Sequence, residues 1–136
     1  MLSNKTEIRV RYADTDKMQF VYNGKYFEYF EVGRSEMMRA HGFPYSQFEN
    51  KGWQLPVLES YAKYKNYARY DEVLVIHAFV KEMPTLKVKI DYEITEKETG
   101  RFIAEGYTLH VFMRGEDKKA IRPPQEFVDA LKPFYK

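Results

Sequence analysis

The chain has 136 residues, and its 22 basic and 20 acidic side chains leave a formal net charge of only +2. So small an excess, with Lys and Arg interleaved among acids rather than grouped in blocks, argues against a nucleic-acid partner. The hydrophobic content of 44% is that of a folded globular protein with room for one core, so we expect a single domain spanning residues 1–136.

The residue inventory excludes several kinds of site. Cysteine is absent, which excludes disulfides, a catalytic thiolate and thiolate metal sites. The histidines His41, His77 and His110 share no metal-ligand spacing, so we expect neither a metal nor another cofactor. The first residues lack the apolar segment of a signal peptide, and no run is long enough to span a bilayer. We therefore expect a cytoplasmic protein without a membrane partner.

The first predicted elements are a strand and a long helix. Residues 7–12 alternate polar and apolar, as a half-buried strand does, and the apolar residues that follow recur at helical spacing. We predict a helix from about Gly24 to His41, with Asn23 as its N-cap and Gly42 as the residue that ends it.

The remainder of the chain favours strands. We predict a loop over residues 43–52, strands over residues 53–67, 73–82, 86–94 and 102–113, and a terminal helix over residues 125–134. Residues 53–67 and 73–82 carry apolar side chains in both alternating sets, which predicts burial on two faces. Residues 86–94 alternate strictly, which predicts one buried face, and Thr99-Gly100 predicts the turn that follows.

The segment before the helix carries the clearest chemical signal. Asp14 and Asp16 precede the predicted helix N-terminus at Asn23. The first N–H groups of a helix lack intrahelical acceptors and lie at the positive end of its dipole, so they can hold a carbonyl oxygen that becomes an oxyanion. A carboxylate can attack a reactive carbonyl directly or deprotonate a water that attacks it. By spacing alone, the two aspartates are equivalent candidates.

A serine hydrolase is a poorer interpretation. Its nucleophile usually occupies a Gly-x-Ser-x-Gly turn between a strand and a helix. The segment Gly33-Arg34-Ser35-Glu36-Met37 lacks the second glycine and falls inside the predicted helix. Carboxylates therefore remain the better candidates for a hydrolytic site.

Further residues combine with this segment into a pattern that extends over nearly the whole chain. The pattern consists of residues 12–26, Phe30, Glu31, Arg34, Glu36, residues 56–64, residues 68–74 and residues 104–108. Together these resemble the signature of the 4-hydroxybenzoyl-CoA thioesterase-like branch of the hotdog superfamily, which includes the YbgC-type acyl-CoA thioesterases. The resemblance implies an α+β hotdog fold, with an antiparallel sheet wrapped around a long central helix. It also implies hydrolysis of an acyl-CoA thioester to a free carboxylic acid and CoA.

The resemblance assigns roles in the segment before the helix. It places the working carboxylate at Asp16, as nucleophile or general base, and leaves Asp14 as an acceptor that supports the turn or the helix. Tyr12 and Asn23 fill the neighbouring catalytic positions, and the N–H of Asn23 with the following helical turn is the implied oxyanion site. YbgC relatives usually have His where Asn23 stands, and often Gly where Gln19 stands, so this chain departs from the pattern at two places.

Five residues are candidates for substrate binding: Tyr22, Gly24, Tyr26, Glu59 and Arg69. Tyr22 and Tyr26 flank the helix start, but core or dimer packing is the alternative for both. Glu59 has a surface or interface charge as its alternative. The guanidinium of Arg69 suits a CoA phosphate. The late basic residues Lys118, Lys119 and Arg122 are further phosphate candidates.

The resemblance also implies an assembly. Hotdog relatives pair through sheet edges, with the acyl pocket between two subunits, so we expect a homodimer or a homotetramer built from dimers. Two alternatives to an acyl-CoA thioesterase remain. One is an acyl carrier protein thioesterase of the same fold, and the other is a non-catalytic protein that binds acyl thioesters, which the departures at Gln19 and Asn23 keep open.

Overall fold

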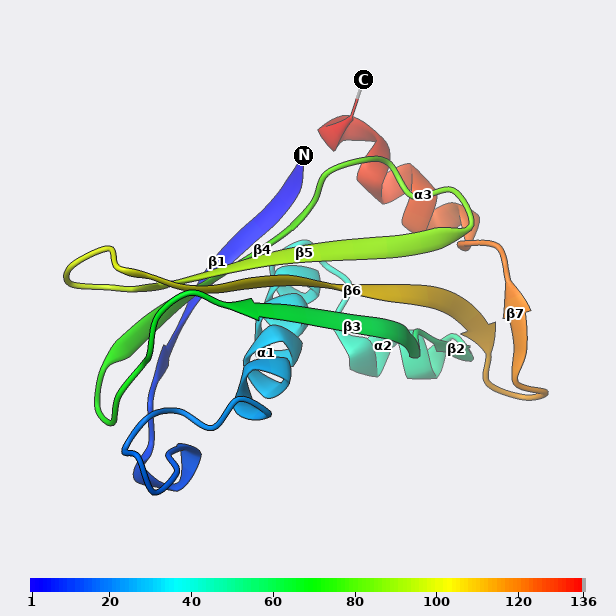
Figure 1. The fold of residues 1–136 in the computed structure, drawn as a ribbon. Coiled ribbons are helices and arrows are strands. Elements are labelled where there is room, and N and C mark those ends of the chain that lie inside the picture. Colours follow the sequence, from blue (N-terminus) through cyan, green and yellow to red (C-terminus); the bar gives the residue numbers. More distant parts are fainter. Residues whose placement is uncertain (136) are drawn as a thin grey trace.

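A computed structural model describes residues 1–135, in which one antiparallel sheet curves around a long helix (Figure 1). The strands are β1 (Leu2–Arg9), β2 (Trp53–Gln54), β3 (Val57–Tyr64), β4 (Val73–Val80), β5 (Lys87–Glu96), β6 (Phe102–Arg114) and β7 (Lys119–Ile121). Their order is β1-β4-β5-β6, and β2, β3 and β7 each pair with the long strand β6. The α+β architecture expected from the sequence is confirmed.

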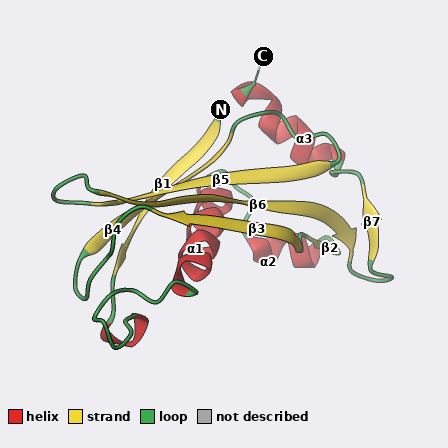
Figure 2. Ribbon diagram, in the orientation of Figure 1, coloured by secondary structure: helices red, strands yellow, loops and turns green. Residues whose placement is uncertain are grey.

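Three helices accompany the sheet (Figure 2). They are α1 (Lys25–Ala40), α2 (Tyr45–Asn50) and α3 (Gln125–Leu131), and single 3-10 turns η1 (Tyr12–Asp14) and η2 (Lys132–Phe134) lie before α1 and after α3. The helix α1 lies against the face of the sheet that curves around it. Its position determines where the segment before it can place functional side chains.

Two glycines let α1 approach the sheet closely. A Cβ atom at Gly33 would lie 2.7 Å from the side chain of Ile76 on β4. A Cβ atom at Gly106 on β6 would lie 2.8 Å from the Phe30 ring of α1. Phe30 is fully buried and stacks on Tyr92 of β5, with ring centroids 4.3 Å apart. A larger residue at Gly33 would push the helix away from β4, and one at Gly106 would collide with the Tyr61 carbonyl of β3 as well as with the Phe30 ring.

The long helix matches its prediction to within one residue at each end. Gly42 follows it with φ of +86°, a left-handed conformation that glycine adopts without a Cβ penalty, so the predicted stop is confirmed. The prediction that the Asn23 side chain caps the helix is wrong. Gly24 occupies the N-cap position, and no side chain caps this end.

Residues 43–52 were expected to form a loop, but they contain the helix α2. It follows Pro44 and buries Phe48 among other aromatic rings, including those of Phe43, Trp53 and Phe112. So short a helix is marginal by propensity alone and depends on tertiary packing of this kind. The local pattern of residues 43–52 therefore could not predict it.

The strand predicted over residues 53–67 is in fact two strands, β2 and β3, separated at Leu55 and Pro56. Proline has no N–H to donate to a sheet, which accounts for the break. Burial on two faces is also wrong for this segment, because β3 is an edge strand and most of its residues are exposed. The matching prediction for residues 73–82 holds better, since β4 has every residue at least partly buried.

The remaining differences are smaller. The first strand covers Leu2–Arg9 rather than residues 7–12, and β7 was not predicted. The predicted buried face is confirmed for Val88, Ile90, Tyr92 and Ile94 of β5, but it is wrong for Leu86, which precedes the strand and is 52% exposed. The turn at Gly100 is confirmed as well, with φ of +74°.

Candidate active site

The segment between β1 and α1 folds back on itself as a tight loop. The Asp16 N–H donates to the carbonyl of Phe20, and the Gln19 N–H donates to the carbonyl of Asp16, each at 2.9 Å. The Tyr22 N–H donates to the carbonyl of Asp14 at 2.9 Å and brings the chain back beside η1. These bonds hold the Asp16 carboxylate in a defined loop immediately before the helix.

Gln19 adopts φ of +68° at the tip of this loop. A left-handed conformation costs a residue with a Cβ roughly 1–2 kcal/mol, whereas glycine adopts it freely. The departure from the family pattern at Gln19 therefore falls on a backbone position that favours glycine. The loop keeps its hydrogen bonds with glutamine in place.

A second segment, residues 66–72, meets this loop across the fold. The Val21 N–H donates to the carbonyl of Ala68 at 2.9 Å, and Phe20 and Arg69 form an isolated antiparallel bridge. The Arg69 guanidinium lies over the Phe20 ring, 5.4 Å from its centroid. These contacts bring Arg69 to the same region as Asp16, although the two residues are far apart in the sequence.

A surface hollow of about 500 Å³ opens where the two segments meet. We call it the Asp16 hollow, and it is lined by Tyr12, Thr15, Asp16, Lys17, Gln19, Arg69 and Tyr70. The structure thus brings together three of the predicted residues: Tyr12, Asp16 and Arg69. Tyr70, which sequence reasoning did not single out, packs edge-to-face against Tyr12 with centroids 5.8 Å apart.

The Asp16 carboxylate has few partners. Its Oδ1 accepts a hydrogen bond from the Met18 N–H at 2.9 Å, and residues 1–135 supply neither a hydrogen bond to Oδ2 nor an ion pair to the group. The residue is partly exposed on the wall of the hollow. A carboxylate in this state can approach a small molecule without first losing a protein partner.

Asp14 differs from Asp16 in both its burial and its hydrogen bonds. Its side chain is only 2% exposed and accepts hydrogen bonds from the Arg11 N–H, the Arg11 guanidinium and the Tyr29 hydroxyl at 3.0–3.2 Å. The Lys25 ammonium lies 3.8 Å away. Burial alone would raise the pKa of Asp14, but the hydrogen bonds from Arg11 and Tyr29 outweigh it and lower that pKa. Asp14 therefore joins η1 to the helix, the supporting role expected for it.

The start of α1 presents two backbone donors without acceptors. The Lys25 N–H donates to the Tyr22 carbonyl at 2.9 Å and the Tyr26 N–H to the Asn23 carbonyl at 3.3 Å. The N–H groups of Asn23 and Gly24 donate to nothing within residues 1–135. Free donors at a helix N-terminus are an arrangement that binds anions and oxyanions.

The side chains around the helix start have different environments. The Tyr64 hydroxyl of β3 donates to the Asn23 carbonyl at 3.2 Å, while the Asn23 side chain is exposed. Tyr22 is 56% exposed, and a Cβ atom at Gly24 would lie 2.7 Å from its ring. Tyr26 is 3% exposed and packs on Tyr64, so it belongs to the core, which was its alternative interpretation. Burial raises the pKa of Tyr26 to about 12.

Glu59 and the late basic residues lie outside the Asp16 hollow. Glu59 is exposed on β3 and accepts a hydrogen bond from the Tyr107 hydroxyl at 2.7 Å. The Lys118 ammonium donates to the Gln54 side chain at 3.0 Å. In the described residues, therefore, neither Glu59 nor the late basic residues line the hollow that contains the carboxylate.

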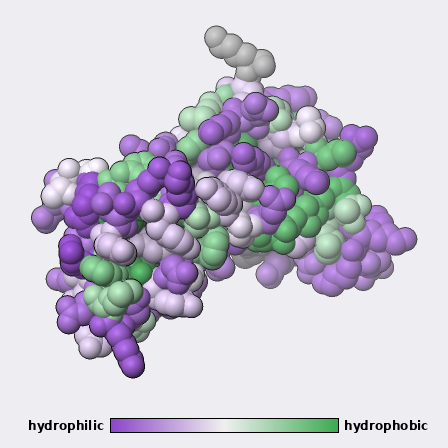
Figure 3. Space-filling view, in the orientation of Figure 1, coloured by the Kyte–Doolittle hydropathy of each residue, from purple (hydrophilic) through white to green (hydrophobic). Residues whose placement is uncertain are grey.

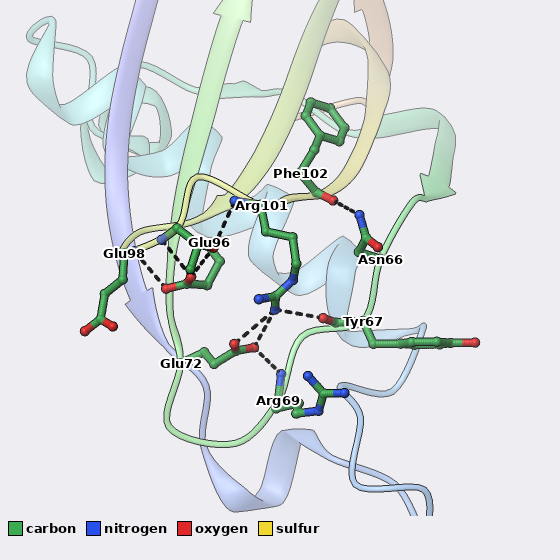
Figure 4. Close-up of polar contacts among 9 residues, drawn as sticks. Asn66, Tyr67, Arg69, Glu72, Glu96, Glu98, Arg101 and Phe102 are labelled. Carbon is green, nitrogen blue, oxygen red and sulfur yellow. Dashed lines mark hydrogen bonds and ion pairs between the residues drawn. The ribbon is translucent and has the colours of Figure 1, made fainter.

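A polar cluster anchors the segment that carries Arg69 (Figure 4). The Arg101 guanidinium bonds both carboxylate oxygens of Glu72 and the carbonyl of Tyr67, each at 3.0 Å. Glu72 in turn accepts a hydrogen bond from the Arg69 N–H at 2.7 Å. Because this ion pair is partly buried, it holds residues 67–72 against the turn between β5 and β6. In the sequence, only the family pattern, which includes residues 68–74, pointed to this cluster.

The three histidines lie outside the Asp16 hollow and contact neighbouring structural elements. The His41 ring lies 3.0 Å from the carbonyl of Ser3, at the C-terminal end of α1. His77 lies on β4, 3.9 Å from Glu93. His110 is fully buried, with ring nitrogens near the Thr108 hydroxyl and the Leu55 carbonyl. Across residues 1–135, no three His, Asp or Glu side chains converge as metal ligands.

In the part of the chain that the structure describes, no helix is both long enough and apolar enough to cross a membrane.

Comparisons with known proteins identify the family of the chain. Residues 10–131 match the sequence model of the Thioesterase-like superfamily. A Bacillus subtilis protein with the provisional name acyl-CoA thioesterase YneP is 33% identical over 93% of this chain and 91% of its own. Escherichia coli YbgC, an acyl-CoA thioester hydrolase, is 32% identical over 56% of this chain and 57% of its own.

A solved structure gives the same assignment for the fold. The DHNA-CoA thioesterase from Staphylococcus aureus is 32% identical, with a TM-score of 0.89 over 98% of this chain and 89% of that protein. The family and the hotdog fold expected from the sequence are both confirmed. The chain belongs to the thioesterase-like superfamily of enzymes and has the hotdog fold.

Proposed function

We propose that the protein is an acyl-CoA thioesterase, which hydrolyses an acyl-CoA thioester to a carboxylic acid and free CoA. One observation carries the proposal: the Asp16 carboxylate lines an open hollow without an ion-pair partner in residues 1–135, and the N–H groups of Asn23 and Gly24, directly before α1, have no acceptor in those residues. The names of YneP, YbgC and the Staphylococcus aureus enzyme support the acyl-CoA substrate.

Asp16 acts on the thioester carbonyl in one of two ways. As a nucleophile, its oxygen bonds to the carbonyl carbon and the C–S bond breaks, which gives a mixed anhydride and the CoA thiolate. Water then hydrolyses the anhydride. As a general base, Asp16 instead takes a proton from the water that attacks the carbonyl. Both routes consume one water and release one carboxylate and one thiol.

The N–H of Asn23, with that of Gly24, stabilises the negative charge that develops on the carbonyl oxygen. Fixed backbone donors at a helix N-terminus need no reorganisation as the charge forms. This role depends on the backbone and not on the Asn23 side chain. It therefore accommodates asparagine where relatives usually have histidine.

CoA recognition is proposed to involve the charged and aromatic residues of the Asp16 hollow. Arg69 suits a phosphate oxygen, and Tyr12 offers an exposed ring beside it. Replacing Arg69 with Ala is expected to raise KM for an acyl-CoA while leaving kcat within about twofold. A fall in kcat with unchanged KM would contradict the role in binding.

Thiol release from a panel of acyl-CoA and acyl carrier protein thioesters tests the proposed function. We expect turnover of CoA thioesters, and we expect it to survive thorough chelation of metal ions. Turnover of carrier-protein thioesters alone would assign the chain to carrier-protein hydrolysis. Binding without turnover of any thioester would make it a binding protein.

We also propose that the active unit is a homodimer in the cytoplasm, joined through β3. This strand pairs with β6 on one side and leaves its other edge without a partner in residues 1–135, beside exposed Leu58 and Tyr61. Leu58→Glu should shift the sedimentation of the protein towards the monomer, whereas Leu86→Glu, at an equally exposed position on the β4–β5 turn, should not. A fully active monomer at assay concentration would contradict the proposal.

A further inference from the structure

Two peptide groups at the start of α1 have bonded carbonyls and free N–H groups. In the peptide between Tyr22 and Asn23, the carbonyl accepts the Lys25 N–H at 2.9 Å, and the Asn23 N–H has no acceptor in residues 1–135. In the peptide between Asn23 and Gly24, the carbonyl is also bonded, and the Gly24 N–H is free in the same residues. A trans peptide group is planar and its carbonyl and N–H point in opposite directions, so a bond that holds the carbonyl also aims the N–H.

These two N–H groups are accessible from solution. Tyr22 and Asn23 are exposed, and Gly24 carries no side chain that could cover them. Figure 3 shows hydrophobic and hydrophilic residues interspersed over the end of the molecule where Figure 1 places η1 and the start of α1. The donors therefore lie where a substrate can reach them, directly after the loop that carries Asp16.

The Asn23 carbonyl is held from two directions. The Tyr26 N–H of α1 donates to it at 3.3 Å, and the Tyr64 hydroxyl, at the end of β3, donates to it at 3.2 Å. Both distances are at the long end of the range for protein hydrogen bonds, so the orientation of the carbonyl depends on the two donors together. Among residues 1–135, Tyr64 supplies the one side chain that bonds a carbonyl of either peptide.

The strand and the core fix the position of the Tyr64 hydroxyl. The backbone of Tyr64 pairs with Ala104 of β6, and its ring packs on the ring of the buried Tyr26, with centroids 5.2 Å apart. Burial and the neighbouring Tyr22 raise the pKa of Tyr64, so the hydroxyl keeps its proton at physiological pH and remains a donor. A group built on a strand in this way holds its partner more precisely than a group on a loop.

We propose that Tyr64 is a positioning residue for the thioesterase reaction: its hydroxyl holds the Asn23 carbonyl so that the Gly24 N–H, beside that of Asn23, faces the carbonyl oxygen of the thioester. This inference rests on the proposed function, because it requires that oxygen to lie at the start of α1. Tyr64 acts through the peptide and does not touch the substrate. The hydrogen bond also polarises the peptide, which makes its N–H a stronger donor as negative charge forms on the substrate oxygen.

Tyr64→Phe removes the hydroxyl and keeps the ring that packs on Tyr26. We expect kcat to fall about three- to tenfold, because one bond that aims the donors is lost, whereas loss of an oxyanion donor itself costs about a hundredfold or more. KM should stay within about twofold, since the donors act on the charged transition state more than on the neutral carbonyl of the bound substrate.

Tyr135→Phe is the matched control. The Tyr135 hydroxyl also donates to a backbone carbonyl, that of Val80, at 2.7 Å. It lies beside the Leu2 N–H at the start of β1, and the loop that carries Asp16 follows the other end of that strand. Tyr135→Phe should therefore leave kcat and KM unchanged. Thermal unfolding of both variants shows what each loses in stability, so that a general loosening of the fold is recognised.

The stretching frequency of a bound carbonyl measures the hydrogen bonds that its oxygen accepts, without any requirement for turnover. The probes are ketone analogues of butyryl-CoA and benzoyl-CoA, isotope-labelled at the carbonyl carbon, in which a methylene group replaces the thioester sulfur and prevents hydrolysis. Infrared difference spectra should show the carbonyl band at lower frequency in the wild-type complex than in solution. In Tyr64→Phe the decrease should be roughly half as large or less, and in Tyr135→Phe it should equal that of wild type.

The outcomes separate this inference from the proposed function. An equal band shift in wild type and Tyr64→Phe, or a raised KM with unchanged kcat, overturns the positioning role and leaves the thioesterase intact. A fall in kcat of about a hundredfold or more also overturns it, because the hydroxyl would then contact the substrate itself. If wild type releases no thiol from any thioester, the proposed function is wrong, and the role of Tyr64 in the reaction falls with it.

Discussion

The Tyr29 hydroxyl donates a 3.0 Å hydrogen bond to the carboxylate of Asp14, and this buried contact separates the two aspartates of the loop. It joins the first turns of α1 to η1 and occupies an oxygen of Asp14. Burial and the neighbouring Asp14 charge raise the pKa of Tyr29, so the hydroxyl remains a donor at physiological pH. Asp16, two residues later, has no comparable partner in residues 1–135.

Asp16→Asn should lower thioester turnover at least about a hundredfold while the fold is preserved. The substitution keeps nearly the same volume but removes the charge needed for nucleophilic or general-base attack. Thiol release from a good acyl-CoA substrate is the measurement, with thermal unfolding and dimer formation as controls. Near wild-type turnover in this variant would make the proposed mechanism wrong.

Asn23→Ala should retain measurable activity. The proposed oxyanion donor is the backbone N–H, which alanine keeps, and the Asn23 side chain does not cap α1. We therefore expect kcat within about tenfold of wild type and an unfolding free energy within about 0.5 kcal/mol. A loss of activity as large as that of Asp16→Asn would show that the side chain takes part in the chemistry.

Asp14→Asn should destabilise the protein by about 2 kcal/mol, because hydrogen bonds to a buried charged group are lost. Asp71→Asn is the matched control, since its ion pair with Arg9 is exposed and should matter little. Denaturant unfolding at neutral pH measures both. The pKa of Asp14 is lower in the folded protein than in the unfolded chain. The ionised carboxylate therefore stabilises the fold at pH values above the ordinary carboxyl pKa, and this stabilisation is lost as the pH falls through the folded-state pKa. Equal effects of the two substitutions would contradict the assignment.

Gln19→Gly should stabilise the protein by up to about 1 kcal/mol. The left-handed φ of +68° strains glutamine, and this gain is reduced by the greater freedom of glycine in the unfolded chain. The midpoint of thermal unfolding gives the sign. A clear decrease would mean that the Gln19 side chain contributes more to the loop than its backbone strain costs.

His110 should make the protein sensitive to mild acid. Burial lowers the pKa of His110 to about 4, so between about pH 6.5 and pH 4 the unfolded chain binds a proton that the folded protein does not. The free energy of unfolding is therefore unaffected by His110 above about pH 6.5. It decreases as the pH falls towards 4, by about 3 kcal/mol in total from this group.

His110→Gln removes the titrating group and retains a side chain that can donate and accept. Its unfolding free energy should change less between neutral and mildly acidic pH than that of wild type, as measured by urea unfolding at both. An identical pH dependence in the two proteins would assign the acid sensitivity to other groups.

Local patterns in the sequence determined those features that depend on near neighbours. The helical spacing of apolar residues located α1 to within one residue at each end, and strict alternation located the buried face of β5. Gly42 and Gly100 marked chain reversals because both positions need a left-handed backbone. The residues that carry the family resemblance were also legible without coordinates, since they form a linear pattern.

The other features of the fold and the site depend on contacts between segments that are far apart in the sequence. Asp14 and Asp16 are equivalent by spacing, and only the packing of Tyr29 against η1 buries the first and leaves the second beside Arg69. The sequence of β3 does not reveal whether a strand covers its outer edge, and α2 depends on aromatic rings that come from other elements. Burial and register are properties of the assembled sheet and helix, so residue order alone could not determine them.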